Sequence, residues 1–301
     1  MAALEPALGA GVARLSTTTV FARRYVASSA RLPRGRRTKG HRVDLGIAGR
    51  WAIVCGSSQG LGRACAEALV AEGVNVVLNG RDAAKLDVTA AELRALSPAE
   101  VRVVVADLTD AATVALLLAT CPAPDIVVTN NAGPKPGGID EVTDADLDHA
   151  LDLHYRAPLA LVRAVLPGMC ERRFGRIVNI TSAMVKRPSG RMIASAGARA
   201  GLTAVMKAIS VDVARYNVTI NSLLPERIDS PRQLHMAQVE MDRDGISFDE
   251  ARRRQAASLA AKRLGRPEEL GATCAFLCSE QAAFISGMNV HLDGGSYPGL
   301  V

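Results

Sequence analysis

Short, mostly apolar runs alternate with amphipathic stretches along most of the chain, and this alternation limits the fold more than any other feature. Runs with the length and β-branched composition of buried parallel strands occupy residues 51–56, 75–80, 101–107, 125–133, 175–182, 218–225 and 287–295. Helical patterns lie between them at 62–73, 82–96, 113–121, 144–173 and 195–216. Repeated strand–helix units joined by right-handed crossovers predict an α/β fold with a doubly wound parallel sheet.

A long charged segment interrupts this alternation after the sixth predicted strand. It spans about residues 226–266 and contains the helical pattern FDEARRRQAASLAAKRL. Doubly wound folds carry substrate-covering lids at the carboxyl ends of strands, so we expect a lid here. A solvated helix pair or an oligomer contact is the alternative. Because no linker interrupts residues 43–301, we expect one Rossmann-like domain that carries this lid.

The formal net charge of +6 comes from the first 42 residues. These residues hold nine Lys and Arg but one acid, whereas the remainder has 27 basic and 29 acidic residues. The remainder therefore gives no electrostatic reason to expect a nucleic-acid partner. No run of about 18 uncharged apolar residues occurs, so we expect no membrane-spanning helix.

Residues 1–42 are rich in Arg, Ala, Ser and Thr, lack sustained apolar periodicity, and are expected to be disordered. Their composition is that of a transit peptide, which would direct a eukaryotic protein to the mitochondrion. The alternative is an over-extended reading frame in a GC-rich gene, with the true start near Val43. We favour the alternative, which predicts a cytoplasmic protein.

The six cysteines show no C-x-x-C spacing. Cys274 and Cys278 are four residues apart on a predicted helix, but two thiols alone make a poor metal site. Most of the six lie in apolar segments, where a free cysteine behaves as a small hydrophobic residue. We therefore expect a reducing compartment, no structural disulfide and no bound metal.

The stretch CGSSQGLGRA places Gly56, Gly60 and Gly62 between the first predicted strand and the first helix. A turn without Cβ atoms lets the backbone approach a pyrophosphate, whose charge interacts favourably with the helix N-terminus. The spacing is G-x-x-x-G-x-G rather than the commoner G-x-G-x-x-G. We expect this turn, with Ser58 and Leu61, to bind a dinucleotide.

The end of the second predicted strand favours NADP(H) over NAD(H). Asn79 stands where an acidic residue would bind the ribose of NAD, and Arg81 follows in LNGRD. No carboxylate there repels a 2′-phosphate, and a guanidinium can pair with one. Asp107, followed by Leu108, is expected to contact the adenine, although an N-cap role for Asp107 is equally open.

Over about residues 45–297 the chain resembles the short-chain dehydrogenase/reductase family, near its 3-oxoacyl-carrier-protein reductase-like members. The resemblance is carried by the glycine motif, NNAG (130–133), Ser182 at the end of VNITS, VTINSLLP and the tail RLGRPEELGATCAFLCSEQAAFISGMNVHLDGG. It implies a carbonyl or alcohol substrate and cofactor contacts at Asn131, Ala132, Gly133 and Pro225. It also implies a homotetramer or homodimer formed by helices 144–173 and 195–216 and the last strand.

The catalytic residues implied by the resemblance are only partly present. The family transfers a proton through Asn, Ser, Tyr and Lys, and of these only Ser182 is found. Ser195 and Arg199 occupy the Tyr and Lys positions, and His154 occupies the Asn position. Between Lys186 and Lys207 the chain has no tyrosine and no further lysine. Arg199 would also contact the cofactor ribose.

These replacements change what the site can do. Serine is a far weaker acid than a phenol, and arginine stays protonated, so neither transfers a proton readily. The ordinary pKa of histidine lies near neutrality. Our hypothesis is that His154 supplies the proton, Ser182 and Ser195 position the oxygen, and Arg199 stabilises charge. The alternative is that His154 is a helix histidine hydrogen-bonded to the backbone.

Two further features concern the nicotinamide end of the expected site. Pro225 is followed by Glu226 where the family has Pro-Gly, and Asp229 and Ser230 stand where a threonine commonly meets the carboxamide. In addition, Lys186, Arg187, Arg191 and Arg199 would surround the pocket, which favours an anionic substrate unless these charges are simply solvated.

Three functions follow from these observations. The first is an NADP(H)-dependent oxidoreductase acting on a carbonyl or hydroxyl group through an atypical proton relay. The second is a non-redox lyase or isomerase that uses His154, Ser182 and Arg199. The third is a catalytically silent dinucleotide-binding protein. The intact glycine turn and NNAG favour the first.

Overall fold

The structure, a computed structural model, describes residues 43–300. Residues 1–42 lie outside the described part, so the expected disorder, the origin of this segment and the compartment inferred from it stay predictions.

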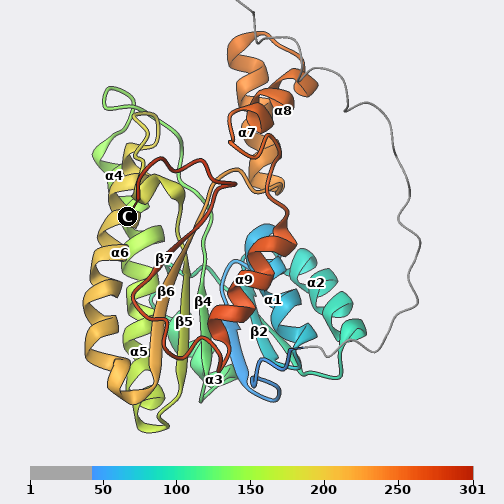
Figure 1. The fold of residues 1–301 in the computed structure, drawn as a ribbon, viewed down its shortest axis with the longest axis vertical. Coiled ribbons are helices and arrows are strands. Elements are labelled where there is room, and N and C mark those ends of the chain that lie inside the picture. Colours follow the sequence, from blue (N-terminus) through green and yellow to red (C-terminus); the bar gives the residue numbers. More distant parts are fainter. Residues whose placement is uncertain (1–42, 301) are drawn as a thin grey trace, which may run out of the picture. The chain divides into compact units, whose positions relative to one another are not determined.

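Seven parallel strands form one sheet in the order β3-β2-β1-β4-β5-β6-β7 (Figure 1). The order reverses between β1 and β4, and crevices at such reversals are where doubly wound sheets bind ligands. The predicted doubly wound parallel sheet is confirmed. Its strands are β1 (Trp51–Val54), β2 (Asn75–Gly80), β3 (Val101–Val105), β4 (Ile126–Thr129), β5 (Gly175–Ile180), β6 (Val218–Pro225) and β7 (Asn289–Leu292).

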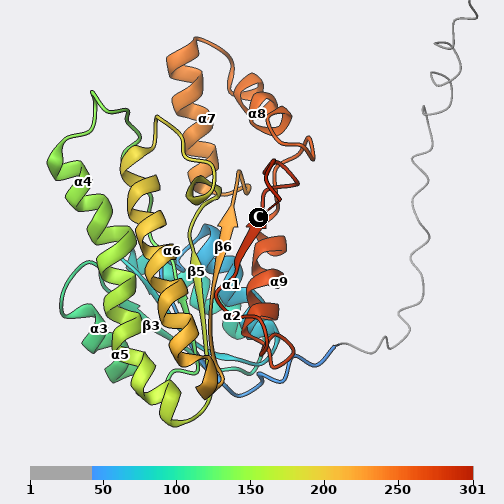
Figure 2. The same ribbon diagram turned by 60° about the vertical axis from the view of Figure 1, so that its left-hand side comes forward.

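Helices cover both faces of the sheet (Figures 1 and 2). On one face pack α1 (Gly60–Ala71), α2 (Ala83–Leu96) and α9 (Pro267–Cys278). On the other pack α3 (Thr113–Thr120), α5 (Ala157–Glu171) and α6 (Ile193–Val213). Successive strand residues point to opposite faces. Ala52 and Val54 therefore pack against the layer of α1, α2 and α9, and Ile53 packs against the layer of α3, α5 and α6. Burial on both faces explains why the strands are apolar throughout.

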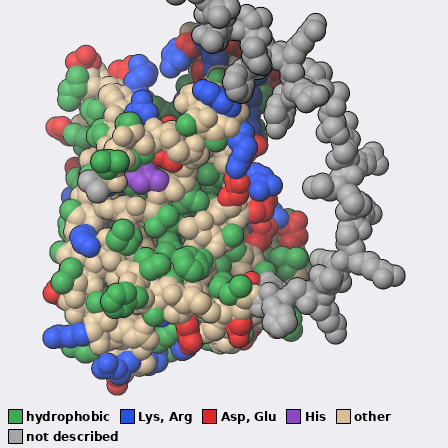
Figure 3. Space-filling view, viewed as in Figure 1, with side chains coloured by type: hydrophobic (Ala, Val, Ile, Leu, Met, Phe, Trp, Pro, Cys, Tyr) green, Lys and Arg blue, Asp and Glu red, His purple; other side chains and the backbone are tan. Residues whose placement is uncertain are grey.

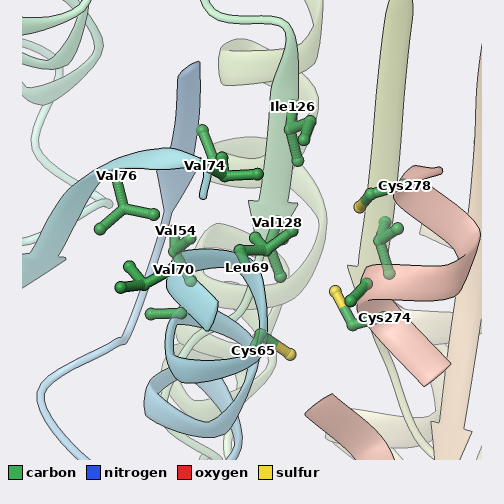
Figure 4. Packing of buried hydrophobic residues seen from close by; sticks show 14 of the residues in the cluster. Val54, Cys65, Leu69, Val70, Val74, Val76, Ile126, Val128, Cys274 and Cys278 are labelled. Carbon is green, nitrogen blue, oxygen red and sulfur yellow. The ribbon is translucent and has the colours of Figure 1, made fainter. Parts of the chain in front are cut away.

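Three thiols lie in the core between α1 and α9 (Figure 4). Cys65 comes from α1, and Cys274 and Cys278 come from consecutive turns of α9. A hydrogen bond with Cys274 and burial raise the pKa of Cys278 well above its ordinary value. All six cysteines are free thiols in the structure. The three therefore pack as small apolar groups.

The helix expected over 144–173 is not continuous. It consists of α4 (Asp144–Leu151), a π-helical turn (Asp152–Arg156) and α5. Pro158 has no N–H, so the carbonyl of His154 lacks its usual donor four residues on. Instead, Ala157 N–H donates to the carbonyl of Asp152, five residues back. Side-chain Nδ2 of Asn131 donates to the carbonyl of Leu153 at 3.3 Å.

After β6 the chain forms α7 (Pro231–Asp244) and α8 (Phe248–Ala257), which extend past the carboxyl ends of the strands (Figures 1 and 2). Both helices lie within the long charged segment noted after the sixth predicted strand. Ion pairs hold the two helices together: Asp244 on α7 lies 3.4 Å from Arg254 on α8, and Arg252 on α8 lies 2.7 Å from Asp229 before α7. The face seen in Figure 3 has basic and acidic side chains interspersed. Within residues 43–300, no helix has the length and apolar character to cross a membrane.

Candidate active site

The glycine turn between β1 and α1 has a shape that lets a ligand approach its backbone closely. Gly56 and Gly60 have φ of 56° and 62°, which favours glycine. A Cβ on Gly62 would overlap the carbonyl of Gly56 and lie 2.9 Å from Nδ2 of Asn130. That amide in turn donates to the Gly56 carbonyl at 3.1 Å. The NNAG segment after β4 therefore holds the turn in shape.

The first turn of α1 leaves its amides available. Its N-cap, Gln59, makes no side-chain cap, and the first turn carries no acidic residue. The helix dipole and these N–H groups form an anion site beside the cavity wall made by Gly56, Ser58, Gly60 and Leu61. Backbone shape, open amides and the position at the strand-order reversal all fit the pyrophosphate of a dinucleotide.

The adenosine end of the expected site contains one cation and one carboxylate. Nη1 of Arg81 lies 3.4 Å from Oδ2 of Asp107. Burial raises the pKa of Asp107, but hydrogen bonds from Thr109 and the charge of Arg81 lower it on balance. Asp107 is not the N-cap of α3, a position held by Ala112. Asn79 is buried, and its side chain donates to the carbonyls of Val104 and Ala106.

A single cavity of about 1090 Å³ joins the glycine turn to the residues expected to react. Its size is sufficient for a large organic ligand. Its lining contains these predicted site residues: Gly56, Ser58, Gly60, Leu61, Arg81, Asp107, Leu108, Asn131, Ala132, Gly133, Ser182, Ser195, Arg199 and Pro225. Gly62 and His154 are not among the lining residues. Gly62 instead packs behind the turn.

Ser195 and Arg199 lie one turn apart on α6 and are joined by a hydrogen bond. Nε of Arg199 donates to Oγ of Ser195 at 3.2 Å, and Nη1 donates to the carbonyls of Ile180 and Thr181 at 2.9 and 2.8 Å. Ser182 follows β5, and its Oγ accepts from Met184 N at 3.2 Å. Both hydroxyl protons are thus free to point at a ligand oxygen.

The environment of Arg199 is low in anions. No described carboxylate forms an ion pair with it. Burial, and then the charge of Arg232, lower the pKa of Arg199 to about 10. The group stays cationic at neutral pH. Its charge is directed at a cavity that contains Ser182 and Ser195, where negative charge on a substrate oxygen would be stabilised.

The structure does not support His154 as the proton donor. Its side chain is 3% exposed in the π-helical turn, and Nε2 has no hydrogen-bond partner within the described part of the chain. Burial, followed by the charges of Arg199, His149 and Arg232, lowers its pKa to about 2. A neutral imidazole outside the cavity cannot deliver a proton as an acid at neutral pH.

The cavity is rich in arginine and poor in acid–base groups. Its described lining contains no Tyr, Lys, His or Cys. Arg187 and Arg191 line it as expected, although Arg191 lies 3.6 Å from Glu141, whereas Lys186 does not line it. Glu226 lines it too, and its backbone N–H donates to the carbonyl of Leu292 at 3.0 Å.

Among the lining residues that the sequence analysis does not predict, two are polar and belong to the first turn of one helix. Arg232 and Gln233 stand in the first turn of α7. Nη2 of Arg232 donates to the carbonyl of Pro134 at 3.4 Å, which places its guanidinium beside Gly133. The sequence SPRQ marks a helix start, because Pro is favoured at the first helical position. That signal locates the helix but does not reveal which cavity it faces.

Comparisons with known proteins agree with this geometry. Residues 56–297 match the family model described as enoyl-(acyl carrier protein) reductase. The NADPH-dependent reductase BacG of Bacillus subtilis (strain 168) is 31% identical over 252 residues, which cover 82% of this chain and 97% of BacG. The 3-oxoacyl-[acyl-carrier-protein] reductase FabG of Escherichia coli (strain K12) is 28% identical over 257 residues, covering 84% and 99%.

The solved structures include an equally full-length match. L-sorbose reductase from Gluconobacter frateurii, crystallised with NADPH and L-sorbose, superposes with a TM-score of 0.81 at 28% identity. The match covers 86% of this chain and 100% of the reductase. This chain and the reductase therefore share the fold over the full length of the reductase.

Proposed function

The chain belongs to the short-chain dehydrogenase/reductase family, and from this premise we propose that it is an NADP(H)-dependent reductase of a carbonyl substrate. One observation carries the proposal: a single cavity connects the glycine turn with Ser182, Ser195 and Arg199. Two relatives support the choice of cofactor, because BacG is an NADPH-dependent reductase and L-sorbose reductase was crystallised with NADPH.

The residues that would hold NADPH follow from the cavity. The turn at Gly56, Gly60 and the first amides of α1 would bind the pyrophosphate. Arg81 would pair with the 2′-phosphate, exchanging its 3.4 Å contact with Asp107 for a stronger dianionic partner. Asn131 and Arg199 would contact the nicotinamide riboside. When bound, NADPH supplies the hydride that reduces the substrate.

The residues of the chain would orient and stabilise the substrate oxygen. The hydroxyls of Ser182 and Ser195 donate to the carbonyl oxygen, and Arg199 stabilises the negative charge that develops on it. Serine and arginine do not supply protons readily at neutral pH. We therefore propose that the product oxygen takes its proton from water in the cavity, directly or through Ser195, and that His154 has no part in this transfer.

One observation favours a second candidate function, that of a catalytically silent NADP(H)-binding protein. The described cavity lining offers no tyrosine, lysine, histidine or cysteine for proton transfer. The non-redox alternative is weaker, because it depends on His154, which lies outside the cavity lining.

A turnover assay separates these candidates. Oxidation of NADPH is followed at 340 nm with a panel of ketones, aldehydes and oxo acids. Turnover that disappears in the Ser182→Ala, Ser195→Ala double variant supports the reductase. Tight NADPH binding without turnover of any carbonyl favours the silent protein, and absence of binding to either nicotinamide cofactor rejects both.

We also propose that the protein forms a homodimer or homotetramer. Support comes from apolar side chains exposed on the elements expected at the interfaces: Leu147 on α4, Val211 on α6 and Met288 before β7. Such residues are commonly covered by a second subunit. Light scattering coupled to size-exclusion chromatography tests this, with Val211→Glu as the variant expected to lower the mass if the α6 surface is an interface.

A further inference from the structure

Two guanidinium groups face the same part of the cavity. Arg199 comes from α6 and Arg232 from the first turn of α7. A Cβ on Gly133 would lie 3.3 to 3.5 Å from the guanidinium of Arg232, so this side chain covers the end of the NNAG segment. Gly133 is an expected contact of the cofactor, and Arg232 therefore stands close to where a substrate would meet it.

Neither guanidinium has an anionic partner within residues 43–300. Arg232 donates to the carbonyl of Pro134, and Arg199 donates to two carbonyls and to Ser195. Their mutual repulsion contributes to the lowered pKa of Arg199, after burial. Arg199 is half-buried and Arg232 is exposed, so solvent screens part of this repulsion, and an anion bound between the two groups would be attracted by both charges.

The beginning of α7 adds uncharged donors. Ser230 is its N-cap but makes no side-chain cap, and the first turn contains no acidic residue. Gln233 is 9% exposed and lines the cavity, but its Nε2 is fully buried, so a ligand in the cavity does not reach this nitrogen. The N–H groups of the first turn of α7 are therefore the uncharged donors that remain for an anion at this end of the cavity.

Apolar side chains line the same region. Met184 and Met192 approach from the segment between β5 and α6, and Met236 and Val239 from α7. A ligand that satisfies both sets of contacts carries an anionic oxygen group and a short aliphatic part. The flexible thioether side chains accommodate aliphatic groups of varied shape.

We infer that the substrate is an aliphatic oxo acid whose carboxylate binds between Arg199 and Arg232. This rests on the proposed reductase function. In the reaction, the ketone C=O becomes C–O–H as hydride adds to carbon and a proton adds to oxygen, while NADPH is oxidised to NADP⁺. The carboxylate itself stays unchanged and orients the ketone toward Ser182 and Ser195.

The activity test compares 2-oxohexanoate with its methyl ester, which keeps the ketone and removes the charge. We expect wild-type kcat/KM to be at least tenfold higher for the acid. Arg232→Gln should raise KM for the acid about tenfold or more, because a charge-assisted hydrogen bond is lost, and should leave KM for the ester unchanged. Arg243→Gln, which removes a cavity-lining charge from the far end of α7, is the matched control and should change neither.

A binding test reads the anion site without turnover. Hexanoate is titrated calorimetrically into protein saturated with NADP⁺, or into protein alone if no cofactor binds. We expect binding that Arg232→Gln weakens at least tenfold and Arg243→Gln leaves within twofold. If hexanoate binds but no carbonyl compound is turned over, the result supports the anion site and contradicts the proposed reductase function. Equal hexanoate affinity in wild type and Arg232→Gln, or weakened NADPH binding as the sole effect of Arg232→Gln, overturns the inference.

Discussion

Nε of Arg199 donates a hydrogen bond to Oγ of Ser195 at 3.2 Å, one turn away on α6. These are the two positions where the family resemblance places a lysine and a tyrosine. In the proposed alignment, a hydroxyl bound to a permanent cation stands where the family has its proton-transferring group. The pair can orient and stabilise a substrate oxygen, and a variant of either residue should therefore change turnover more than cofactor binding.

Arg199→Gln is expected to lower kcat by about 10²–10³, as the removal of a preorganised charged donor typically does. Arg199→Lys should lower kcat by a smaller factor, and kcat should still be below that of the wild type. A single ammonium cannot donate simultaneously to Ser195 and to the carbonyls of Ile180 and Thr181 in the arginine's geometry. Steady-state kinetics and NADPH affinity measured on the same preparations check this. If both variants reduce only NADPH affinity, Arg199 is a cofactor contact and not a group that stabilises the substrate oxygen.

The glycine turn should tolerate no side chain at Gly62. A Cβ there overlaps the Gly56 carbonyl, so Gly62→Ala should move the turn and weaken NADPH binding at least tenfold. Gly197→Ala is the control, because its Cβ would meet nothing within 4 Å and it lies on an exposed part of α6. That variant should raise the free energy of unfolding by about 1 kcal/mol, as expected for Gly→Ala in a helix, and keep NADPH affinity. Chemical denaturation and calorimetry give both quantities.

Arg81 should set the preference for NADPH. Arg81→Ala removes the cation proposed to pair with the 2′-phosphate, so the Kd for NADPH should rise about tenfold and that for NADH should stay constant. Lys85→Ala is the control, since Lys85 is a nearby exposed cation paired with Asp82 at 2.8 Å and does not line the cavity. Equal loss of NADPH affinity in both variants would show a general charge effect.

Buried His154 should make the fold sensitive to acid. Its pKa is about 2 in the folded protein and 6.5 for an ordinary histidine, so between these values the unfolded chain binds the extra proton. Stability therefore falls as pH drops below about 6.5, by up to about 1.4 kcal/mol per pH unit, or about 2 kcal/mol at pH 5. His154→Leu should reduce this slope, whereas His235→Leu on exposed α7 should not. Urea titrations at pH 5, 6 and 7 measure it, and equal slopes in wild type and His154→Leu would contradict it.

Much of the fold follows from local sequence rules. Apolar β-branched strands and amphipathic helices specify a parallel sheet between two layers of helices, because strands buried on both faces must be covered by helices on both faces. The sequence does not predict the π-helical turn at residues 152–156, although Pro158 lies two residues after it. A proline is tolerated in the first turn of a helix, so its presence alone does not distinguish a helix start from a π-turn.

The site was harder to predict than the fold, for a physical reason. Residue type shows that His154 can titrate near neutrality, but burial and neighbouring cations set its pKa, and both depend on tertiary contacts. Arg232 and Gln233 belong to the connection after β6, whose path over the cavity no periodicity encodes. By contrast, Ser195 and Arg199 share one face of a helix by spacing alone, and the structure joins them directly.

Calorimetric titration of the full-length protein with NADPH, and separately with NADH, is the most direct measurement of whether the glycine turn and the first turn of α1 hold a phosphorylated nicotinamide dinucleotide. The predicted result is one NADPH per chain, bound at least tenfold more tightly than NADH. Failure of both nucleotides to bind, under conditions where the protein is folded, would contradict the account.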